Sequence, residues 1–489
     1  MIPLSIFSIN LVSENLLLLV SVMIVAAAFV VKTGSRLGTP SLLLFLILGM
    51  LAGPDVLGIH IEDAHLAESV GHFAMAVILF TAGLETSLQE TKPVLHQGVM
   101  LSTVGVLLTV LITGAFVCLW GIPPITAFLL AAILGSTDSA SVFSVLTEKK
   151  MQLRENLGPM LELESGSNDP IALTLTVVLA QFASNPTLLE GNAWSTIGTG
   201  LLMMLLQLGV GLAMGLLVGY GGKWLIGKLQ SDNFALTAIL VIGVGFFANG
   251  VAQLLFGNGL LATYVAAIVI GNTVQLENRK DIVKFYGGLT WMMQLVMFLM
   301  LGLLARPSQM LPFILPALGL CVFMAFVARP LSVFACLLPF RELSLKARAF
   351  VSWVGLKGAG PILFALYAVI QGVDYSAEIF NFVFLFSLFS LLLQGGSLAR
   401  VAGKLGLTYD EDPVPETFGM EIPEEMGMLR DHVVTEEDLA LATTLREMHL
   451  PHGIRVVMVR RGEKFLVPHG SMPLEVGDKL VIMIGESDD

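Results

Sequence analysis

Charged residues are scarce in this chain. Of its 489 residues, 13% are Asp, Glu, Lys or Arg, while 55% are hydrophobic and the mean hydropathy is +0.83. Soluble domains carry roughly 25% charged residues, so most of this chain cannot be a soluble globular protein.

Cysteine is scarcer still. Cys118, Cys321 and Cys336 lie in apolar runs without metal-ligand spacing, which favours small packing residues over a disulfide or a metal site.

Long apolar runs recur from Asn15 to Ala399. A run of about 20 residues crosses a hydrocarbon core of about 30 Å. The pattern therefore predicts an all-α polytopic membrane domain with about thirteen transmembrane helices. The predicted spans cover residues 15–34, 40–53, 67–88, 94–118, 124–147, 159–182, 198–225, 233–255, 259–271, 283–304, 311–338, 347–371 and 377–400.

Basic residues are absent from the first fifteen positions and nearly absent from every second loop. The first span is therefore interpreted as an uncleaved helix and not as a signal peptide.

One set of alternate loops holds only Arg306, whereas the other set and the segment after the last span hold sixteen basic residues. Positive residues stay on the cytoplasmic side, so the asymmetry predicts a multi-pass protein of the bacterial inner membrane with a periplasmic N-terminus and a cytoplasmic C-terminus.

Acidic residues concentrate near the C-terminus. Residues 1–404 carry 19 basic and 20 acidic residues, whereas residues 405–489 carry 7 and 18. We therefore divide the chain into a transmembrane domain (1–404), an acidic linker (405–425) and a small cytoplasmic α/β domain (426–489). The net charge of −12 argues against a nucleic-acid partner.

The sequence of the cytoplasmic domain predicts a short helix followed by three strands. Thr435 and Asp438 predict a capping box that opens a helix over 439–450, and residues 454–460, 464–467 and 479–484 predict strands. This order resembles the regulatory TrkA-C (RCK_C) module of potassium channels and transporters. No GxGxxG motif follows a soluble strand, so we expect no dinucleotide-binding lobe and no cofactor, and the ligand of the module stays open.

A few ionisable residues lie inside the predicted spans. A charge at mid-bilayer costs about 2.5–3.5 kcal/mol on insertion scales, so such residues are normally paired or functional. They are Glu85, Asp138, Glu162, Glu164, Asp169, Arg329 and Lys357.

Asp169 is the deepest carboxylate of the sixth span. It lies about ten residues from the start of the span, hence about 15 Å deep and near the midplane. Pro170 lacks an amide hydrogen and Gly166 weakens the preceding turn, which predicts a backbone that opens here and lends oxygens to a ligand. The alternative is a structural Asp169 paired with Arg329 or Lys357.

Two spans are interrupted, by GSTDSAS (135–141) and by GLKGAGP (355–361). Interruptions at corresponding places in two halves are typical of transporters with two inverted repeats, whose broken helices cross at the substrate site. The first six and the last six spans are the predicted repeats. For Thr137 and Asp138, capping of the second half-helix is an alternative role that is compatible with ion binding.

Two basic residues in the spans receive structural roles. Lys357 is expected to offset the helix C-termini or an ionised carboxylate at the crossing. Arg329 is expected to form an ion pair with Glu164 that braces the neighbouring broken helix.

Together, TDS, ESGSND, AR and GLKG on the fifth, sixth, eleventh and twelfth spans resemble the NhaP branch of the monovalent cation/proton antiporters over about residues 10–404. The resemblance implies a homodimer whose mobile core domain carries the ion like an elevator. It assigns ion binding and proton coupling to six residues, with the last contacting the asparagine: Asp169, Asn168, Ser165, Thr137, Asp138 and Glu85. Two positions depart from the family pattern, since Ser139 replaces the proline of TDP and Lys357 the arginine of GLRG.

These residues predict a carrier. Because Asn168 is an amide, Asp169 is the one titrating carboxylate of its motif, and it can hold either a cation or a proton. We expect electroneutral exchange of potassium for protons, with Na+, Li+ and Rb+ as other candidate cations and a sodium/proton antiporter as the alternative. A gated cation channel is disfavoured because no TVGYG-like filter is present, and an enzyme because the spans lack a paired base and nucleophile. Membrane lipid is the remaining expected partner.

Overall fold

The computed structural model describes residues 16–34, 41–59, 63–148, 151–185, 193–229, 233–274, 279–410, 429–435, 438–439, 442–448, 454–461 and 464–484. The chain divides into two units, Met1–Tyr409 and Asp410–Asp489.

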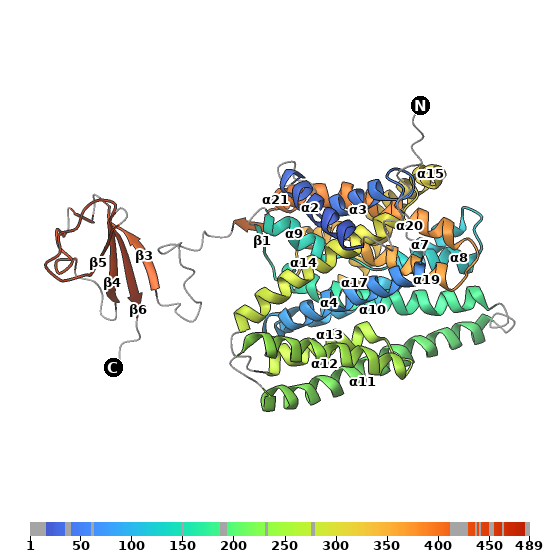
Figure 1. Cartoon of the computed structure of the whole chain (residues 1–489), viewed down its shortest axis with the longest axis horizontal. Helices are drawn as coiled ribbons and strands as arrows, with labels where there is room; N and C mark the ends of the chain where they lie inside the picture. The colour runs from blue at the N-terminus through green and yellow to red at the C-terminus, as the bar shows by residue number, and fades with distance from the viewer. Residues whose placement is uncertain are drawn as a thin grey trace. The chain divides into compact units, whose positions relative to one another are not determined.

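The first unit is a bundle of apolar helices (Figure 1). Within the described residues, seven helices are long and apolar enough to cross a membrane, and five shorter apolar helices accompany them. The α-helices are α2 (Leu16–Gly34), α3 (Ser41–Ala52), α4 (Ala64–Glu85), α5 (Leu88–Thr91), α6 (Leu95–Met100), α7 (Val106–Cys118), α8 (Pro124–Ile133), α9 (Ser139–Glu148), α10 (Leu157–Ser184), α11 (Ala193–Leu229), α12 (Phe234–Leu254), α13 (Gly259–Thr273), α14 (Arg279–Leu304), α15 (Pro307–Met310), α16 (Ile314–Phe323), α17 (Arg329–Leu337), α18 (Leu345–Trp353), α19 (Ala359–Ile370), α20 (Ser376–Ser390) and α21 (Gly396–Leu405).

Short tighter or wider turns join some of these helices into longer ones. Single 3-10 turns lie at Lys92–Val94 and Leu311–Phe313. Single π-helical turns at Leu101–Gly105, Met324–Ala328 and Leu391–Gly395 connect α6 to α7, α16 to α17 and α20 to α21. Such π-turns inside α-helices occur frequently at functional sites, and the second one directly precedes Arg329.

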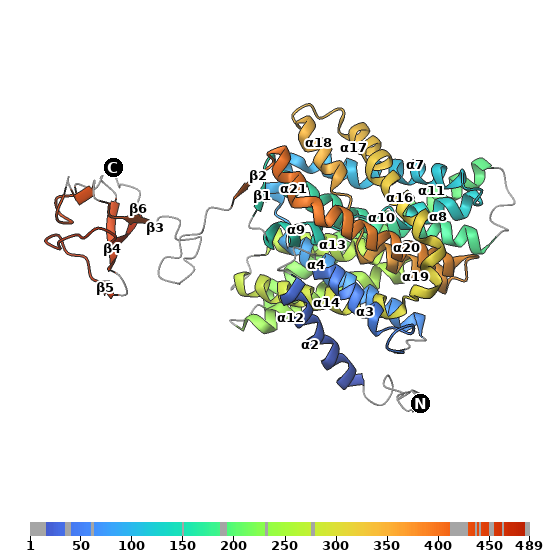
Figure 2. The ribbon, with the colours of Figure 1, turned by 90° about the horizontal axis from the view of Figure 1, so that it is seen from above.

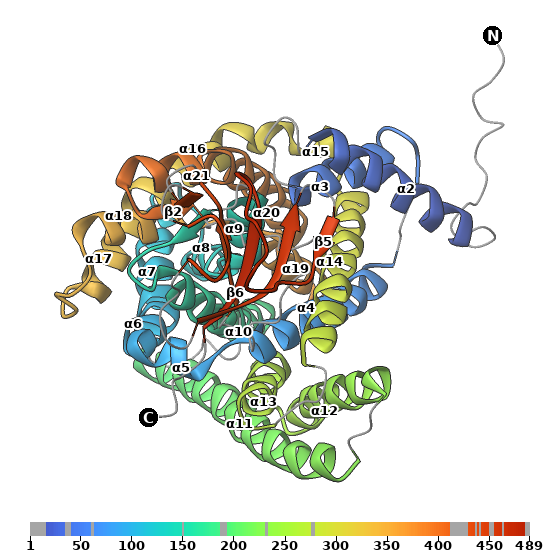
Figure 3. The ribbon, with the colours of Figure 1, turned by 90° about the vertical axis from the view of Figure 1, so that its left-hand side faces the viewer.

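Helix α4 lies between several helices that are distant in sequence. It packs against α13 and also contacts α14 and α19, while α11, α12 and α13 lie side by side at one edge of the unit (Figure 3). A short two-stranded sheet pairs β1 (Met151–Leu153) with β2 (Thr408–Asp410), close to α9 and α21 (Figure 2). Strand β1 lies between α9 and α10 in the sequence.

Both predicted interruptions are present. Helix α8 ends at Ile133 and α9 begins at Ser139, while α18 ends at Trp353 and α19 begins at Ala359. Glycine and charged residues occupy both gaps, so the backbone has little tendency to continue as helix there.

The predicted opening of the backbone at Asp169 is wrong, because α10 runs unbroken through Pro170. Gly166 serves close packing instead: a Cβ there would lie 2.5 Å from Cζ of Tyr264. The turn after the proline is braced by Asn258, whose Nδ2 donates to Pro170 O at 2.8 Å and to Thr174 Oγ1 at 2.9 Å.

The second unit contains one antiparallel sheet with strand order β3-β6-β4-β5. Its strands are β3 (Leu429–Val433), β4 (Ile454–Arg461), β5 (Lys464–Leu466) and β6 (Lys479–Ile484). The predicted strands over 454–460, 464–467 and 479–484 are confirmed, whereas β3 was not predicted. The core of the unit includes Val434, Val459 and Leu480.

The prediction of a helix over 439–450 is wrong within residues 442–448, which form turns. Here the backbone bonds to a neighbouring segment instead: Arg446 N donates to Gly470 O at 2.9 Å, and Leu474 N donates to Thr443 O at 3.0 Å. The capping box itself forms, since Thr435 N donates to Asp438 Oδ2 at 2.9 Å and Asp438 N to Thr435 Oγ1 at 3.3 Å.

A buried carboxylate anchors the turn before β6. The Asp478 side chain is 1% exposed and accepts hydrogen bonds from Arg461 Nε (2.9 Å) and Nη2 (2.7 Å) and from Glu475 N (2.9 Å). Burial by itself raises the pKa of the Asp478 carboxyl, but these hydrogen bonds and the Arg461 charge outweigh burial and hold the pKa below its usual value. The ionised form therefore stabilises the sheet.

Replacing Asp478 with Asn in the full-length protein should loosen this sheet at neutral pH. The amide keeps the shape but loses the charge-assisted bonds, so deuterium uptake in β4 and β6 should rise by roughly tenfold after correction for intrinsic exchange. The matched control, Glu475→Gln, removes a 64% exposed partner of Arg461 and should change little. A carboxyl group whose pKa is lowered by folding stabilises the folded state at pH values above its pKa in the unfolded chain. The deuterium uptake of wild type and variant should therefore converge only in acid, below about pH 4. Equal uptake at neutral pH would contradict this role.

Candidate functional site

The two helix breaks meet through their backbones. Asp138 N, in the break between α8 and α9, donates to Leu356 O, in the break between α18 and α19, at 2.9 Å. The Asp138 carboxylate caps α9 by accepting from Ser141 N at 3.1 Å and Ser141 Oγ at 2.5 Å. Broken backbone at membrane depth needs partners inside the protein, and the crossing supplies them.

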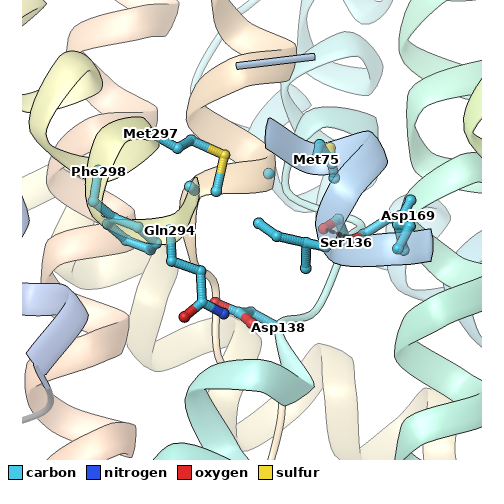
Figure 4. Close-up of a pocket in the computed structure, with 11 residues that line it drawn as sticks. Met75, Ser136, Asp138, Asp169, Gln294, Met297 and Phe298 are labelled. Atoms are coloured by element: carbon cyan, nitrogen blue, oxygen red, sulfur yellow. Dashed lines mark hydrogen bonds between the residues drawn. The ribbon is translucent and has the colours of Figure 1, made fainter. Parts of the chain in front are cut away.

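Asp169 faces a small cavity beside this crossing (Figure 4). Ser136 Oγ, from the first break, donates a hydrogen bond to Asp169 Oδ1. The cavity has a volume of about 40 Å³, and Ser136, Asp138 and Asp169 form its polar wall. A buried water needs about 10–15 Å³, so the space suits a few waters or one alkali cation with part of its hydration shell.

The other wall of the cavity comes from helices far away in sequence. Helix α4 contributes Met75, Ile78 and Leu79, and α14 contributes Gln294, Met297 and Phe298. Ala359 and Gly360 close the cavity at the start of α19. None of these residues is predicted from the sequence, because apolar side chains and a single glutamine on otherwise apolar helices carry no motif.

Thr137, Ser165 and Asn168 lie behind the polar wall, outside the residues that line the cavity. All three are buried. Ser165 Oγ donates to Thr137 O at 2.8 Å, and Asn168 Nδ2 donates to Thr137 Oγ1. These bonds attach the first break to α10, so the three residues hold Ser136 and Asp138 in place next to Asp169.

Glu85 does not join this group, which corrects its predicted contact with the asparagine. It is the exposed last residue of α4, beyond the part of the helix that faces the cavity. Asn168 donates to Thr137 instead of to Glu85, and Asn168 Oδ1 has no hydrogen-bond partner among the described residues.

Lys357 binds the first break from the opposite side. Its ammonium group, in a side chain that is 3% exposed, donates to Ser136 O at 2.6 Å, and its backbone N donates to Ser390 Oγ at 3.0 Å. Ser136 thus contacts Asp169 through its hydroxyl and Lys357 through its carbonyl. Ser136 lies in GSTDSAS but was not predicted as a site residue, because a serine next to Thr137 and Asp138 carries no charge and no motif of its own.

Glu164 and Arg329 form a buried ion pair. Arg329 Nη2 donates to Glu164 Oε1, and the two side chains are 4% and 1% exposed. Neither residue lines the cavity that holds Asp169. The pair therefore connects α17 to α10 one turn before Asp169 and acts as a brace.

Comparison with known proteins identifies the fold family. The model of the family "Sodium/hydrogen exchanger, transmembrane" matches residues 22–404. The chain belongs to the sodium/hydrogen exchanger family. A second model, the TrkA-C domain, matches residues 429–488 of this exchanger-family chain.

Several relatives extend over nearly the whole chain. The K(+)/H(+) antiporter NhaP2 of Shewanella sp. (strain ANA-3) is 36% identical over 96% of this chain and 81% of its own length. The K(+)/H(+) antiporter NhaP of Alkalimonas amylolytica is 34% identical over 93% of this chain and 75% of its own length. The Na(+)/H(+) antiporter NhaH of Halobacillus aidingensis is 28% identical over 80% of this chain and 97% of its own.

The fold is also similar to a solved structure. The sodium proton antiporter MjNhaP1 from Methanocaldococcus jannaschii superposes with a TM-score of 0.66 over 79% of this chain and 97% of that chain, at 22% identity. This exchanger-family chain therefore has the helical membrane-antiporter fold.

Replacing Arg329 with Ala should damage stability more than ion chemistry. The change leaves Glu164 buried without its partner, which costs about 3–5 kcal/mol for a buried pair. We expect a lower melting temperature in detergent for Arg329→Ala and a recovery in the double variant Glu164→Gln/Arg329→Met, where neither charge remains. A double variant no more stable than Arg329→Ala would show that the two side chains are not energetic partners.

Proposed function

We propose that this chain is a secondary transporter, without enzymatic activity, that exchanges potassium ions for protons across the bacterial inner membrane. The observation that carries the proposal is the cavity at the crossing of the two broken helices, which the Asp169 carboxylate faces. Carboxylate oxygens bind both hard cations and protons. Because both ions use the same oxygens, binding of one displaces the other.

We further propose that the exchange is electroneutral and one-for-one. Both oxygens of the Asp138 carboxylate accept hydrogen bonds from Ser141 at the positive end of α9, so this carboxylate serves as the cap of that helix. Asn168 supplies an amide where a second carboxylate would add another titrating charge. Asp169 then remains as the group that alternates between cation and proton.

Potassium is proposed as the cation because the relatives that cover almost the whole chain are named K(+)/H(+) antiporters. Sodium is the second candidate. It is supported by the more distant Na(+)/H(+) antiporter NhaH. Lithium and rubidium are to be tested with them.

The proposed topology has thirteen spans in two inverted repeats, with the N-terminus in the periplasm and the C-terminus in the cytoplasm. It is supported by the alternation of basic residues along the loops and by the two interrupted helices, whose breaks bond to each other. Elevator movement and a homodimer are proposed from the family resemblance. Helix α11 is the least buried of the seven long helices and offers a face for lipid or for a second copy.

A regulatory role for the TrkA-C domain is also proposed, and the sheet of β1 and β2 supports it. Strand β2 leads into the C-terminal segment, and Arg154 N, just after β1, donates to Leu407 O, just before β2, at 2.8 Å. Strand β1 connects α9, at the crossing, to α10, which carries Asp169. A change in the tail would thus reach the site through a hydrogen-bonded backbone and bias its conformational states.

Replacing Asp169 with Asn should abolish exchange while preserving the fold, because the amide keeps the shape but neither titrates nor neutralises a cation. The measurement is dequenching of a pH-sensitive dye in inverted vesicles after addition of K+, Na+, Li+ or Rb+. Glu162→Gln, an exposed carboxylate on the same helix, is the matched control and should retain most of the exchange. Cation-dependent proton flux in Asp169→Asn vesicles would refute the assignment.

Removing residues 411–489 should leave an active exchanger whose rate responds differently to internal pH, because the proposed ion site lies wholly within the first unit. Arg154→Pro should reproduce this altered response, since proline lacks the amide that bonds to Leu407 O. Arg154→Ala keeps that amide and serves as the control. The rates are compared in matched proteoliposomes between pH 6 and 9.

Superimposable pH curves for the truncated and full-length proteins would argue against regulation by the tail. The truncated protein could instead show an altered pH curve while Arg154→Pro keeps the curve of the full-length protein. That result would show that the coupling does not pass through the β1–β2 sheet.

A further inference from the structure

The cavity at Asp169 has two chemically different walls. Ser136, Asp138 and Asp169 make one wall polar, whereas α4 and α14 supply the other. Of the six side chains from α4 and α14, five are apolar and one, Gln294, is polar. Methionine sulfur and aromatic carbon are poor ligands for hard alkali cations, so the only good oxygen ligand of this wall is Gln294 Oε1.

The carboxamide of Gln294 is directed toward the cavity. Figure 4 places it beside the Asp138 carboxylate and across from Ser136, with the amide nitrogen on the Asp138 side; a half-turn of the amide, which keeps its shape, puts Oε1 in that place when a cation binds. Gln294 is half-buried and, among the described residues, no hydrogen bond involves its side chain. A polar group at such a place costs free energy unless it finds a partner, and the cavity is where that partner can bind.

The position of Gln294 is fixed by its neighbours on α14. One turn earlier, Thr290 Oγ1 donates to Thr81 Oγ1 of α4 at 2.9 Å. Trp291 packs edge-on against Phe45 of α3 with ring centroids 5.7 Å apart, and Leu295 is buried. The glutamine therefore extends from a well-packed helix, which is what a specific ligand requires.

We propose that Gln294 contacts the transported cation from the wall opposite Asp169 and sets the preference among alkali cations. Carboxylates present a strong electric field that favours protons and small cations, whereas a neutral amide oxygen has a weaker field that suits a larger cation. Gln294 replaces a water of the cation's hydration shell on the side that the crossing does not reach. The inference rests on the proposed exchange of an alkali cation for protons at Asp169.

The experiment compares two substitutions of Gln294 with a matched control. Gln294→Leu removes the oxygen and keeps much of the volume, and Gln294→Glu turns the weak-field oxygen into a carboxylate. Gln207→Leu makes the same chemical change on α11, away from the cavity. Exchange in proteoliposomes gives the half-saturating concentration and the maximal rate for K+, Rb+, Na+ and Li+. Stabilisation of each purified protein by the same cations, measured as a shift in melting temperature, reports binding without transport.

Gln294→Leu should raise the half-saturating concentration of K+ and Rb+ by about tenfold, as expected for loss of one contact to a charged partner, and that of Na+ less. Gln294→Glu should shift the preference toward Na+ and Li+, and Gln207→Leu should behave as wild type. The cation-induced stabilisation should change in the same order.

Unchanged ratios between the cations in both Gln294 variants, with folded proteins and normal maximal rates, would overturn the inference. So would a loss of maximal rate alone, with half-saturation unaltered. A wild type that exchanges Na+ but not K+ would refute the potassium proposal separately, and the Gln294 variants would then be judged on the cation order that the wild type shows. If no cation is exchanged, unchanged melting shifts in Gln294→Leu would overturn the inference on binding alone.

Discussion

Two helix breaks in the buried interior of the membrane domain leave backbone groups with no helical partner and no water, and the chain resolves this by joining the two breaks to each other. The bond from Asp138 N to Leu356 O links the breaks, and Lys357 fastens Ser136 O from the other side. Each bond satisfies a group that would otherwise be costly at this depth. The geometry around Asp169 depends on this crossing, because the hydroxyl of Ser136 can reach the carboxylate only while the break keeps its shape.

In the proposed function, the same arrangement couples ion binding at Asp169 to the protein's conformation. Ser136 contacts Asp169 with its hydroxyl and Lys357 with its carbonyl, while Thr137 is tied to α10 by Ser165 and Asn168. A cation or a proton that takes up the Asp169 oxygens competes with the Ser136 hydrogen bond, so a change of occupant acts on the break itself. The Glu164–Arg329 pair, one turn away on α10, resists deformation of the helix that carries the carboxylate.

Much of this could be predicted from the sequence where chemistry forces the outcome. The breaks at GSTDSAS and GLKGAGP could be predicted because glycine and charged residues disfavour the interior of an apolar helix, and strands β4 and β6 could be predicted from their composition. The same reasoning fails for ESGSND, because α10 stays helical there. The prediction that Gly166 weakens the helix was wrong, because this glycine makes room for the Tyr264 ring. The sequence alone does not distinguish these two roles of a glycine. Residues 442–448 have a composition that favours a helix, but their backbone forms hydrogen bonds with residues 470–474. Local helix propensity cannot predict such a tertiary contact. Gln294 and Ser136 were missed because their importance comes from the neighbours that the fold gives them.

In the proposed exchange, the Asp169 carboxylate alternates between one cation and one proton. The flux ratio of K+ to H+, together with the dependence of the rate on membrane potential, can be measured in proteoliposomes whose potential is clamped at several values. Competition at Asp169 predicts a ratio of one-for-one and a rate that does not change with potential. A ratio different from one-for-one, or a rate that rises with potential of one sign, would contradict it.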